Sequence, residues 1–339
     1  MRTALAGLFG KKKSVVQKIA DQPQGPISPI YQDNPGSSLE NQSSRYTSAC
    51  LWADANGHNP VEYLLPQIHV KTEIEPFLFE RRFVREKATP PSAEQLEALA
   101  PWHYQIEFGA VATRPWRLMM EWGFHRYRAS MLVALAAEIA GRERSSLSVL
   151  DVACHCGVFS LEFAERGFGS VRGLDIREEN IEQAQFLART FGISNASFGV
   201  ANARDLAQAE QADIVFCAGL IYHVTFPMEL FANIYDRTKE FAVIDTVAQK
   251  HPFSGFHLVC SKDPALSIEG ETHYEFMPTY RALIDALHAV GFEEVYEVLG
   301  DRAAEVPLYQ DHNVRSFLAV KNRDGVFKGF RSRNAASAA

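Results

Sequence analysis

Cysteine is scarce in this chain, and the few cysteines form no regular pattern. The 339 residues contain five, an odd number, at positions 50, 154, 156, 217 and 260. Secreted domains that depend on disulfides usually carry an even number of cysteines at short spacings. The sequence therefore argues against a disulfide framework and predicts a reducing, cytoplasmic location.

Long apolar runs and a surplus of basic residues are also missing. The N-terminal apolar run, Ala4–Phe9, is too short for a signal sequence or a membrane span. The formal net charge is -7, whereas proteins that bind nucleic-acid backbones usually carry excess lysine and arginine. These absences disfavour a membrane span and a nucleic-acid partner. A small-molecule partner is expected, and a homodimer is left open.

Composition divides the chain into four parts. Residues 1–45 are rich in Pro, Gly, Ser, Gln and Asn, which predicts a flexible N-terminal segment. Residues 46–100 have a mixed pattern and are expected to form an N-terminal cap region, and residues 322–339 a flexible tail. In residues 101–321, short apolar runs rich in β-branched residues alternate with segments of helical periodicity. This alternation predicts an α/β fold with a largely parallel sheet.

The expected elements follow from this alternation. The predicted strands are Ser146–Val152, Ser170–Asp175, Ala196–Val200, Asp213–Cys217, Phe241–Thr246, Glu293–Val298 and Arg315–Val320. The predicted helices are Val158–Glu165, Glu178–Phe191, Met228–Asp236 and Thr279–Val290.

A turn with few glycines follows the first of these strands, in SVLDVACHCGVFS. Ligands of open α/β sheets bind at the carboxyl ends of the strands, where small residues let the ligand approach the backbone. The alternate positions after Asp151 hold Ala153, His155 and Gly157, so only one is glycine. Asp175 ends the next strand, 24 positions after Asp151. A carboxylate at this place can accept hydrogen bonds from both hydroxyl groups of a nucleotide's ribose. Together these residues predict a nucleotide-like cofactor.

The cysteines of this turn have other interpretations. Cys154, His155 and Cys156 lack a second pair of ligands at usable spacing downstream, so no metal site is expected. A C-x-C pair also lacks the C-x-x-C helix start of a redox site. The two cysteines are therefore expected to fill the turn as small side chains.

The order of these segments resembles the class I S-adenosylmethionine-dependent methyltransferases over about residues 101–321. The segments that carry the resemblance are VLDVACHCG, GLDI, ANARDL, DIVFCAGLIYHVTFP and FAVIDT. Within that family the likeness is nearest to the branch of the tRNA wobble-uridine carboxymethyl-transferring enzymes, through PWHYQIEF, GLIYHVTFP and EFMPT. The resemblance implies a Rossmann-like, seven-stranded methyltransferase sheet with an N-terminal cap region.

The resemblance also implies where S-adenosylmethionine binds. The implied cofactor-binding residues are Asp151, Ala153, Cys154, His155, Gly157, Asp175, Ile176, Asn202, Ala203, Gly219 and Leu220. His155 either contacts the carboxylate of the cofactor or caps the turn. The carboxymethyl branch uses a basic residue that PWHYQIEF lacks, and this difference favours ordinary methyl transfer.

Tyr222 and His223 follow the fourth strand and are the predicted catalytic residues. His223 either removes a proton from the acceptor or tethers the loop. The predicted acceptor-binding residues are Trp102, Tyr104, Glu271, His273 and Tyr274. Arg117, Arg126 and Arg128 either hold an acidic acceptor or form a solvated helix face, and the sequence favours the solvated face.

These expectations predict methyl transfer to an oxygen, nitrogen or sulfur atom of a small molecule. An enzyme that modifies the tRNA wobble uridine and a non-catalytic cofactor-binding protein are the alternatives. A nicotinamide-dependent oxidoreductase is disfavoured, because only one of the three glycines of its fingerprint is present.

Overall fold

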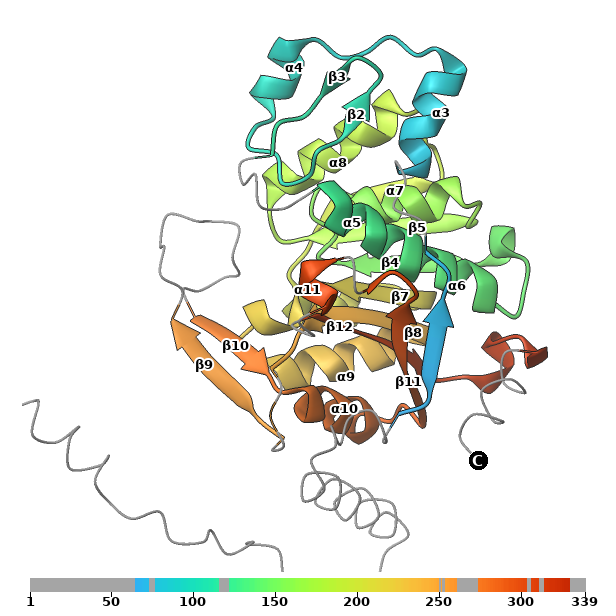
Figure 1. The fold of residues 1–339 in the computed structure, drawn as a ribbon, viewed down its shortest axis with the longest axis vertical. Helices are drawn as coiled ribbons and strands as arrows, with labels where there is room; N and C mark the ends of the chain where they lie inside the picture. The colour runs from blue at the N-terminus through green and yellow to red at the C-terminus, as the bar shows by residue number, and fades with distance from the viewer. Residues whose placement is uncertain are drawn as a thin grey trace, which may run out of the picture. The chain divides into compact units, whose positions relative to one another are not determined.

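In the computed structural model, an eight-stranded and mostly parallel sheet forms the centre of the fold (Figure 1). The strands lie in the order β1-β11-β12-β8-β7-β4-β5-β6. β12 runs antiparallel to both of its neighbours, and the other pairs are parallel. The bounds are β1 Gln67–Val70, β4 Ser148–Val152, β5 Ser170–Asp175, β6 Ala196–Val200, β7 Ala212–Ala218, β8 Thr238–Val247, β11 Glu294–Gly300 and β12 Val314–Val320.

The structure describes residues 65–72, 77–115, 122–249, 251, 254–260, 274–303, 306–310 and 314–329. All of them belong to one compact unit, residues 49–339. The predicted flexible segment 1–45, the acceptor candidates Glu271 and His273, and residues 330–339 of the predicted tail lie outside the described residues.

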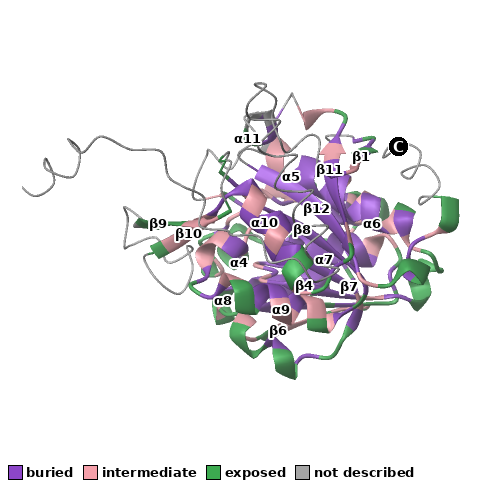
Figure 2. Ribbon diagram, turned by 90° about the horizontal axis from the view of Figure 1, so that it is seen from below, coloured by how far each residue is buried: buried purple, intermediate pink, exposed green. Residues whose placement is uncertain are grey.

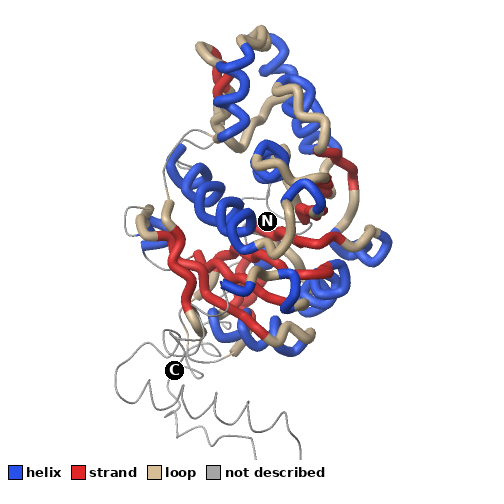
Figure 3. Tube along the Cα trace, turned by 90° about the vertical axis from the view of Figure 1, so that its right-hand side faces the viewer, coloured by secondary structure: helices blue, strands red, loops and turns tan. Residues whose placement is uncertain are grey.

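Helices cover both faces of the sheet (Figures 1 and 3). α7 (Val158–Glu165) and α8 (Glu178–Thr190) pack on β4, β5 and β6, and α9 (Pro227–Arg237) packs on β7 and β8. α10 (Tyr280–Ala289) lies beside α9. Figure 2 shows the buried strands enclosed by these helices. Strands that are covered on both faces need continuous apolar runs, as in Phe241–Ile244 of β8, which is fully buried.

The N-terminal elements pack against the face that carries α7. They are α3 (Leu78–Glu86), α4 (Ala93–Ala98), the short hairpin β2 (Glu107–Phe108) and β3 (Val111–Ala112), α5 (Trp122–Arg128), η2 (Ala129–Val133) and α6 (Ala134–Ile139). The rings of Phe79, Phe83 and Phe108 surround Phe191, which follows α8. This aromatic cluster fixes the N-terminal elements on the domain.

The predicted fold class is confirmed; several helix and strand ends shift by a few residues, and the following differences have a structural reason. The sheet has eight strands rather than seven, because β1 comes from the predicted cap region and pairs with β11. The first strand begins at Ser148 rather than Ser146, because Arg144–Ser146 form a 3-10 turn, η3. A hairpin of β9 (Phe256–Cys260) and β10 (Tyr274–Pro278) was not predicted. No helix in the described part of the chain is both long and apolar enough to cross a membrane.

Candidate functional site

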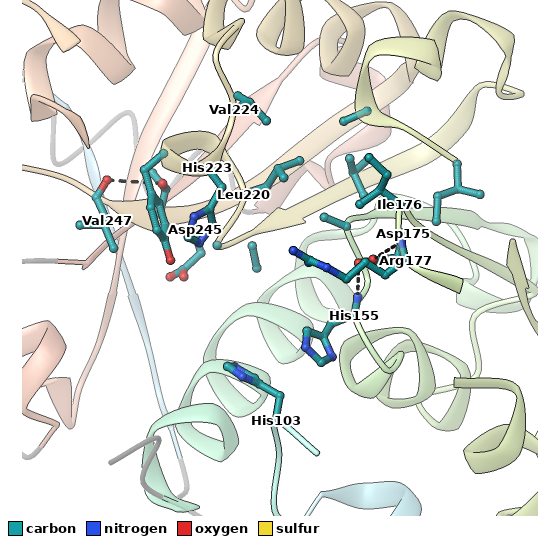
Figure 4. Close-up of a pocket in the computed structure, with 18 of the residues that line it drawn as sticks. His103, His155, Asp175, Ile176, Arg177, Leu220, His223, Val224, Asp245 and Val247 are labelled. Carbon is teal, nitrogen blue, oxygen red and sulfur yellow. Dashed lines mark hydrogen bonds between the residues drawn. The ribbon is translucent and has the colours of Figure 1, made fainter. Parts of the chain in front are cut away.

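A cavity of about 350 Å³ opens at the carboxyl ends of the parallel strands (Figure 4). Its walls come from the ends of β4, β5, β7 and β8, from α5 and from the segment that precedes α5. Of the predicted site residues, those that line it are Tyr104, Ala153, His155, Asp175, Ile176, Asn202, Ala203, Gly219, Leu220, Tyr222 and His223. The cavity therefore brings together candidates that are far apart in the sequence.

The turn between β4 and α7 adopts a left-handed backbone at all three alternate positions. The φ angles are 60° at Ala153, 52° at His155 and 78° at Gly157. Only glycine takes this conformation without strain. Hydrogen bonds hold the two strained residues in place, because the His155 amide donates to Asp175 (3.0 Å) and the Cys156 amide donates to Nδ1 of His155 (2.8 Å). The backbone of the turn thus adopts the left-handed conformation that favours glycine, although two of the three positions carry a side chain.

Gly157 is required both by its backbone angle and by its surroundings. A Cβ at this position would lie 2.6 Å from the ring of Phe198. We expect Gly157→Ala to lower the free energy of unfolding by about 2–4 kcal/mol, since it adds overpacking to backbone strain. Gly167→Ala is the matched control, because Gly167 has a φ of 86° and no atom within 4 Å of its Cβ position. Denaturant unfolding that shows equal losses for the two variants would contradict this account.

Asp175 connects the turn to the end of β5. Its carboxylate accepts hydrogen bonds from the amides of His155 and Arg177 and from the side chain of Asn180, each of 3.0 Å. A carboxylate has about four acceptor sites, so one site remains for a hydroxyl group in the cavity. Asp175 is therefore placed to hold both the turn and a ribose.

Three predicted cofactor residues lie behind the cavity wall. Among the described residues, Asp151, Cys154 and Gly157 do not line the cavity. The carboxylate of Asp151 accepts a hydrogen bond from Ser160 (2.6 Å), and burial raises its pKa to about 7. Burial likewise raises the pKa of the Cys154 thiol above its ordinary value. These three residues therefore belong to the structure of the turn behind the cavity wall and not to its surface.

An apolar slot forms one end of the cavity. Ile176 follows β5, and Asn202 and Ala203 begin the 3-10 helix η4 (Ala203–Gln208). Asn202 caps this helix by accepting a hydrogen bond from the amide of Arg204 (2.9 Å). Leu206 and Phe226, which the sequence analysis missed, complete the slot. Its walls suit a flat ring with polar edges.

Tyr222 and His223 belong to the turn η5 (Ile221–His223) after β7, and both line the cavity. Nδ1 of His223 lies 3.3 Å from a carboxylate oxygen of Glu275 on β10. The Tyr222 and His223 rings are 3.9 Å apart. Hairpin β9–β10 therefore places a carboxylate beside His223, a contact that the sequence could not reveal because the hairpin was not predicted.

A buried ion pair forms the floor of the cavity beside η5. Arg128 on α5 donates to Asp245 at the end of β8 (2.5 Å), and Asp245 also accepts from Tyr309 (2.5 Å) and Ser316 (2.6 Å). Burial alone would lower the pKa of Arg128, but Asp245 raises it above its ordinary value. Arg126 is buried too and pairs with Glu80 (2.9 Å). The prediction of a solvated face is therefore wrong for Arg126 and Arg128, and Arg117 lies outside the described residues.

Aromatic residues of the N-terminal region close the remaining side. Tyr104 and His103 line the cavity together with His125 of α5, a residue that the sequence analysis did not single out. Trp102 is buried outside the lining and donates its indole N–H to Leu96 (2.8 Å). Tyr274 is half-exposed on β10 and is also outside the lining among the described residues. Trp102 therefore supports the wall from behind.

No three histidine, cysteine, aspartate or glutamate side chains in the described ranges lie as the ligands of a metal ion would. In particular, Cys154 and Cys156 are buried thiols of the turn.

Comparisons with known proteins agree with this geometry. Residues 143–281 match a family model described as a methyltransferase domain. The chain is 29% identical over 118 residues to a ubiquinone biosynthesis O-methyltransferase of Neisseria meningitidis, covering 34% of this chain and 50% of that relative. It is also 29% identical over 157 residues to a tRNA U34 carboxymethyltransferase of Helicobacter pylori, covering 44% of this chain and 58% of the relative. The chain thus spans about half the length of these relatives.

A solved structure shares the fold. The N-terminal domain of EvdMO1 with bound S-adenosylhomocysteine (SAH) matches with a TM-score of 0.51 and 21% identity, over 68% of this chain and 94% of that domain. At this identity the match supports the fold alone.

Proposed function

We propose that this chain, which carries a class I methyltransferase domain, binds S-adenosylmethionine and transfers its methyl group to a small-molecule acceptor. The observation that carries the proposal is the meeting of Asp175, the left-handed turn 153–157 and the η5 loop around one cavity. Release of S-adenosylhomocysteine from S-adenosylmethionine, measured with a panel of hydroxyl, amine and thiol acceptors, tests it.

The residues present fit the cofactor. The carboxylate of Asp175 suits the ribose hydroxyls, and the slot at Ile176, Asn202 and Ala203 suits the adenine ring. Gly219 has a φ of 79° and leaves room at the end of β7 for the sulfonium group. The amide of Gly219 also donates to the backbone carbonyl of Asp245 (2.8 Å). This hydrogen bond fixes the start of the loop that follows β7 beside the Arg128–Asp245 ion pair.

When bound, S-adenosylmethionine supplies an electrophilic methyl group. The protein has to place the acceptor atom in line with that group and to remove a proton from a hydroxyl acceptor. Nε2 of His223 is the base in this proposal, with Nδ1 turned toward Glu275 (3.3 Å). The carboxylate stabilises the imidazolium that forms after the proton is taken.

His223 is expected to act in turnover and not in cofactor binding. We expect His223→Gln to lower kcat about 10²–10⁴-fold for a hydroxyl acceptor, because glutamine cannot take the proton. The affinity for S-adenosylhomocysteine stays unchanged in calorimetry. His288→Gln, at an exposed position of α10, is the control. Full turnover by the His223 variant would show that this residue only tethers the loop.

A tRNA wobble uridine is the second candidate acceptor, because the Helicobacter pylori relative is a tRNA U34 carboxymethyltransferase. The net charge of -7 disfavours it. A salt-dependent gel shift with bulk tRNA separates the two candidates, since the small-molecule proposal predicts no shift at physiological salt.

The proposal also covers the cellular location, the domain limits and the oligomeric state. A cytoplasmic location is part of the proposal, and the odd number of five cysteines supports it. The domain limits at residues 101 and 321 and a homodimer stay predictions, which limited proteolysis and sedimentation velocity test.

A further inference from the structure

The cavity has an apolar region beside His223. Figure 4 shows His223 and Asp245 on one side of the cavity and Asp175 on the other, so this region lies away from the proposed ribose position. Four apolar side chains line it, each from a different element. They are Phe124 of α5, Val247 at the end of β8, Leu308 of the short helix α11 (Pro307–Gln310) and Val314 at the start of β12. We call these four side chains the apolar wall.

The members of the apolar wall meet around Tyr309. Leu308 precedes Tyr309 in α11, and the ring of Phe124 lies 5.8 Å from the tyrosine ring. The Tyr309 hydroxyl donates to Asp245 of β8, two positions before the valine of that strand. The two valines are paired residues of the β8–β12 ladder. The apolar wall therefore lies on the side of the cavity that holds Asp245.

Leu308 is the most exposed member of the apolar wall. Its side chain is 41% exposed. A single exposed leucine on a protein surface needs no special explanation. Leu308, however, lines a cavity together with three other apolar side chains, and a concave apolar surface is typical of a ligand site. We therefore interpret Leu308 as part of a binding surface.

The charged groups at this side of the cavity are paired with each other. The guanidinium of Arg128 donates to Asp245, and this carboxylate also accepts from two hydroxyl groups. The rings of Phe124 and Phe159 lie 5.1 Å and 5.4 Å from the guanidinium carbon and cover it. A charged group of an acceptor would thus lose its hydration here without gaining an unpaired partner from Arg128 or Asp245.

His223 supplies a polar contact for an uncharged acceptor. Its Nδ1 faces Glu275 (3.3 Å), so Nε2 is left to accept a hydrogen bond from a hydroxyl group in the cavity. The carboxylate of Glu275 is outside the lining among the described residues. One hydroxyl group next to an apolar body matches this arrangement.

We infer that the acceptor is an uncharged, mainly apolar hydroxyl compound and that Leu308 is a residue that determines this specificity. The inference rests on the proposed function, because it takes the apolar wall as the place of the acceptor. The acceptor oxygen forms a bond to the methyl carbon, and the carbon–sulfur bond breaks with its electron pair remaining on sulfur. Nε2 of His223 takes the hydroxyl proton.

The first arm of the test titrates three phenols onto the wild-type protein loaded with S-adenosylhomocysteine. They share the ring and the hydroxyl group and differ in the charge of the tail, which is neutral in 4-propylphenol, cationic in tyramine and anionic in 4-hydroxyphenylacetate. We expect 4-propylphenol to bind about 10-fold or more tightly than either ion, because a charged tail loses its hydration at the apolar wall. Equal or tighter binding of an ion, or no binding of 4-propylphenol, overturns the inference.

The second arm changes the charge of the apolar wall at Leu308, whose exposure lets a polar side chain replace it without entering the core. Leu308→Arg is expected to raise the affinity for 4-hydroxyphenylacetate about 10-fold or more, and Leu308→Glu that for tyramine, through new charge-assisted hydrogen bonds. Both variants bind 4-propylphenol more weakly than the wild-type protein does.

Leu258→Arg is the matched control, because Leu258 is 61% exposed on β9 and lies outside the cavity lining. It leaves all three affinities unchanged. Circular dichroism shows whether each variant is folded, and folded Leu308 variants that keep the wild-type order of affinities overturn the role of Leu308. Wild-type protein that does not bind S-adenosylhomocysteine overturns the proposed function instead.

Discussion

Replacing Asp175 by alanine is expected to weaken the binding of S-adenosylmethionine by about 100-fold or more. Hydrogen bonds to a charged group contribute roughly 1.5–3 kcal/mol each, and a ribose hydroxyl would lose its acceptor. The same substitution removes the partner of the His155 amide (3.0 Å), so the strained turn loses its support as well. Calorimetric titration of the purified variant measures the effect.

The control for this prediction is Asp205→Ala. Asp205 is also an acidic residue at this edge of the domain, on η4, but it is exposed and outside the cavity lining. Its removal should leave the affinity unchanged. If the Asp175 variant also binds as tightly as the wild-type protein, then this carboxylate does not hold the ribose and the cofactor assignment fails.

Replacing Arg128 by methionine is expected to destabilise the fold by about 3–5 kcal/mol. The substitution leaves Asp245, which is 1% exposed, as a buried carboxylate without its cation. Tyr309 and Ser316 still donate to this carboxylate, but neutral donors do not balance a buried charge. Denaturant unfolding followed by circular dichroism measures the loss.

Two comparisons make this second prediction specific. Arg323→Met removes an arginine that pairs with Glu294 but is 61% exposed, and it should cost only about 0–1 kcal/mol. The double variant Arg128→Met with Asp245→Asn should be more stable than Arg128→Met alone, because the unbalanced charge is gone. A loss for Arg128→Met no larger than that for Arg323→Met would contradict the importance of the buried pair.

The central strands could be predicted from the sequence because each is a short apolar run between polar segments. The limits of β5 and β6 agree with the prediction at both ends, and α7 does as well. β1 escaped prediction because it has four residues, of which His69 is exposed, and it depends on pairing with β11 far along the chain. Its stability comes from the sheet and not from a local pattern.

The site could be predicted only where its residues follow one another in the sheet. The turn 153–157 and Asp175 follow adjacent strands, so their meeting is a consequence of the topology. Arg128 and Asp245 are 117 positions apart, and nothing in the local pattern of RPWRLMMEWGFHRYR shows that its arginines are buried. His125 was missed for the same reason, since its neighbours His103 and His155 come from other segments.

The most direct test is calorimetric titration of the 339-residue protein with S-adenosylhomocysteine, with NADH as the control ligand. We expect one site per chain, micromolar affinity for S-adenosylhomocysteine and no heat from NADH. Absence of S-adenosylhomocysteine binding by folded protein would contradict this expectation, and would mean that the left-handed turn at Ala153 and His155 no longer admits the cofactor.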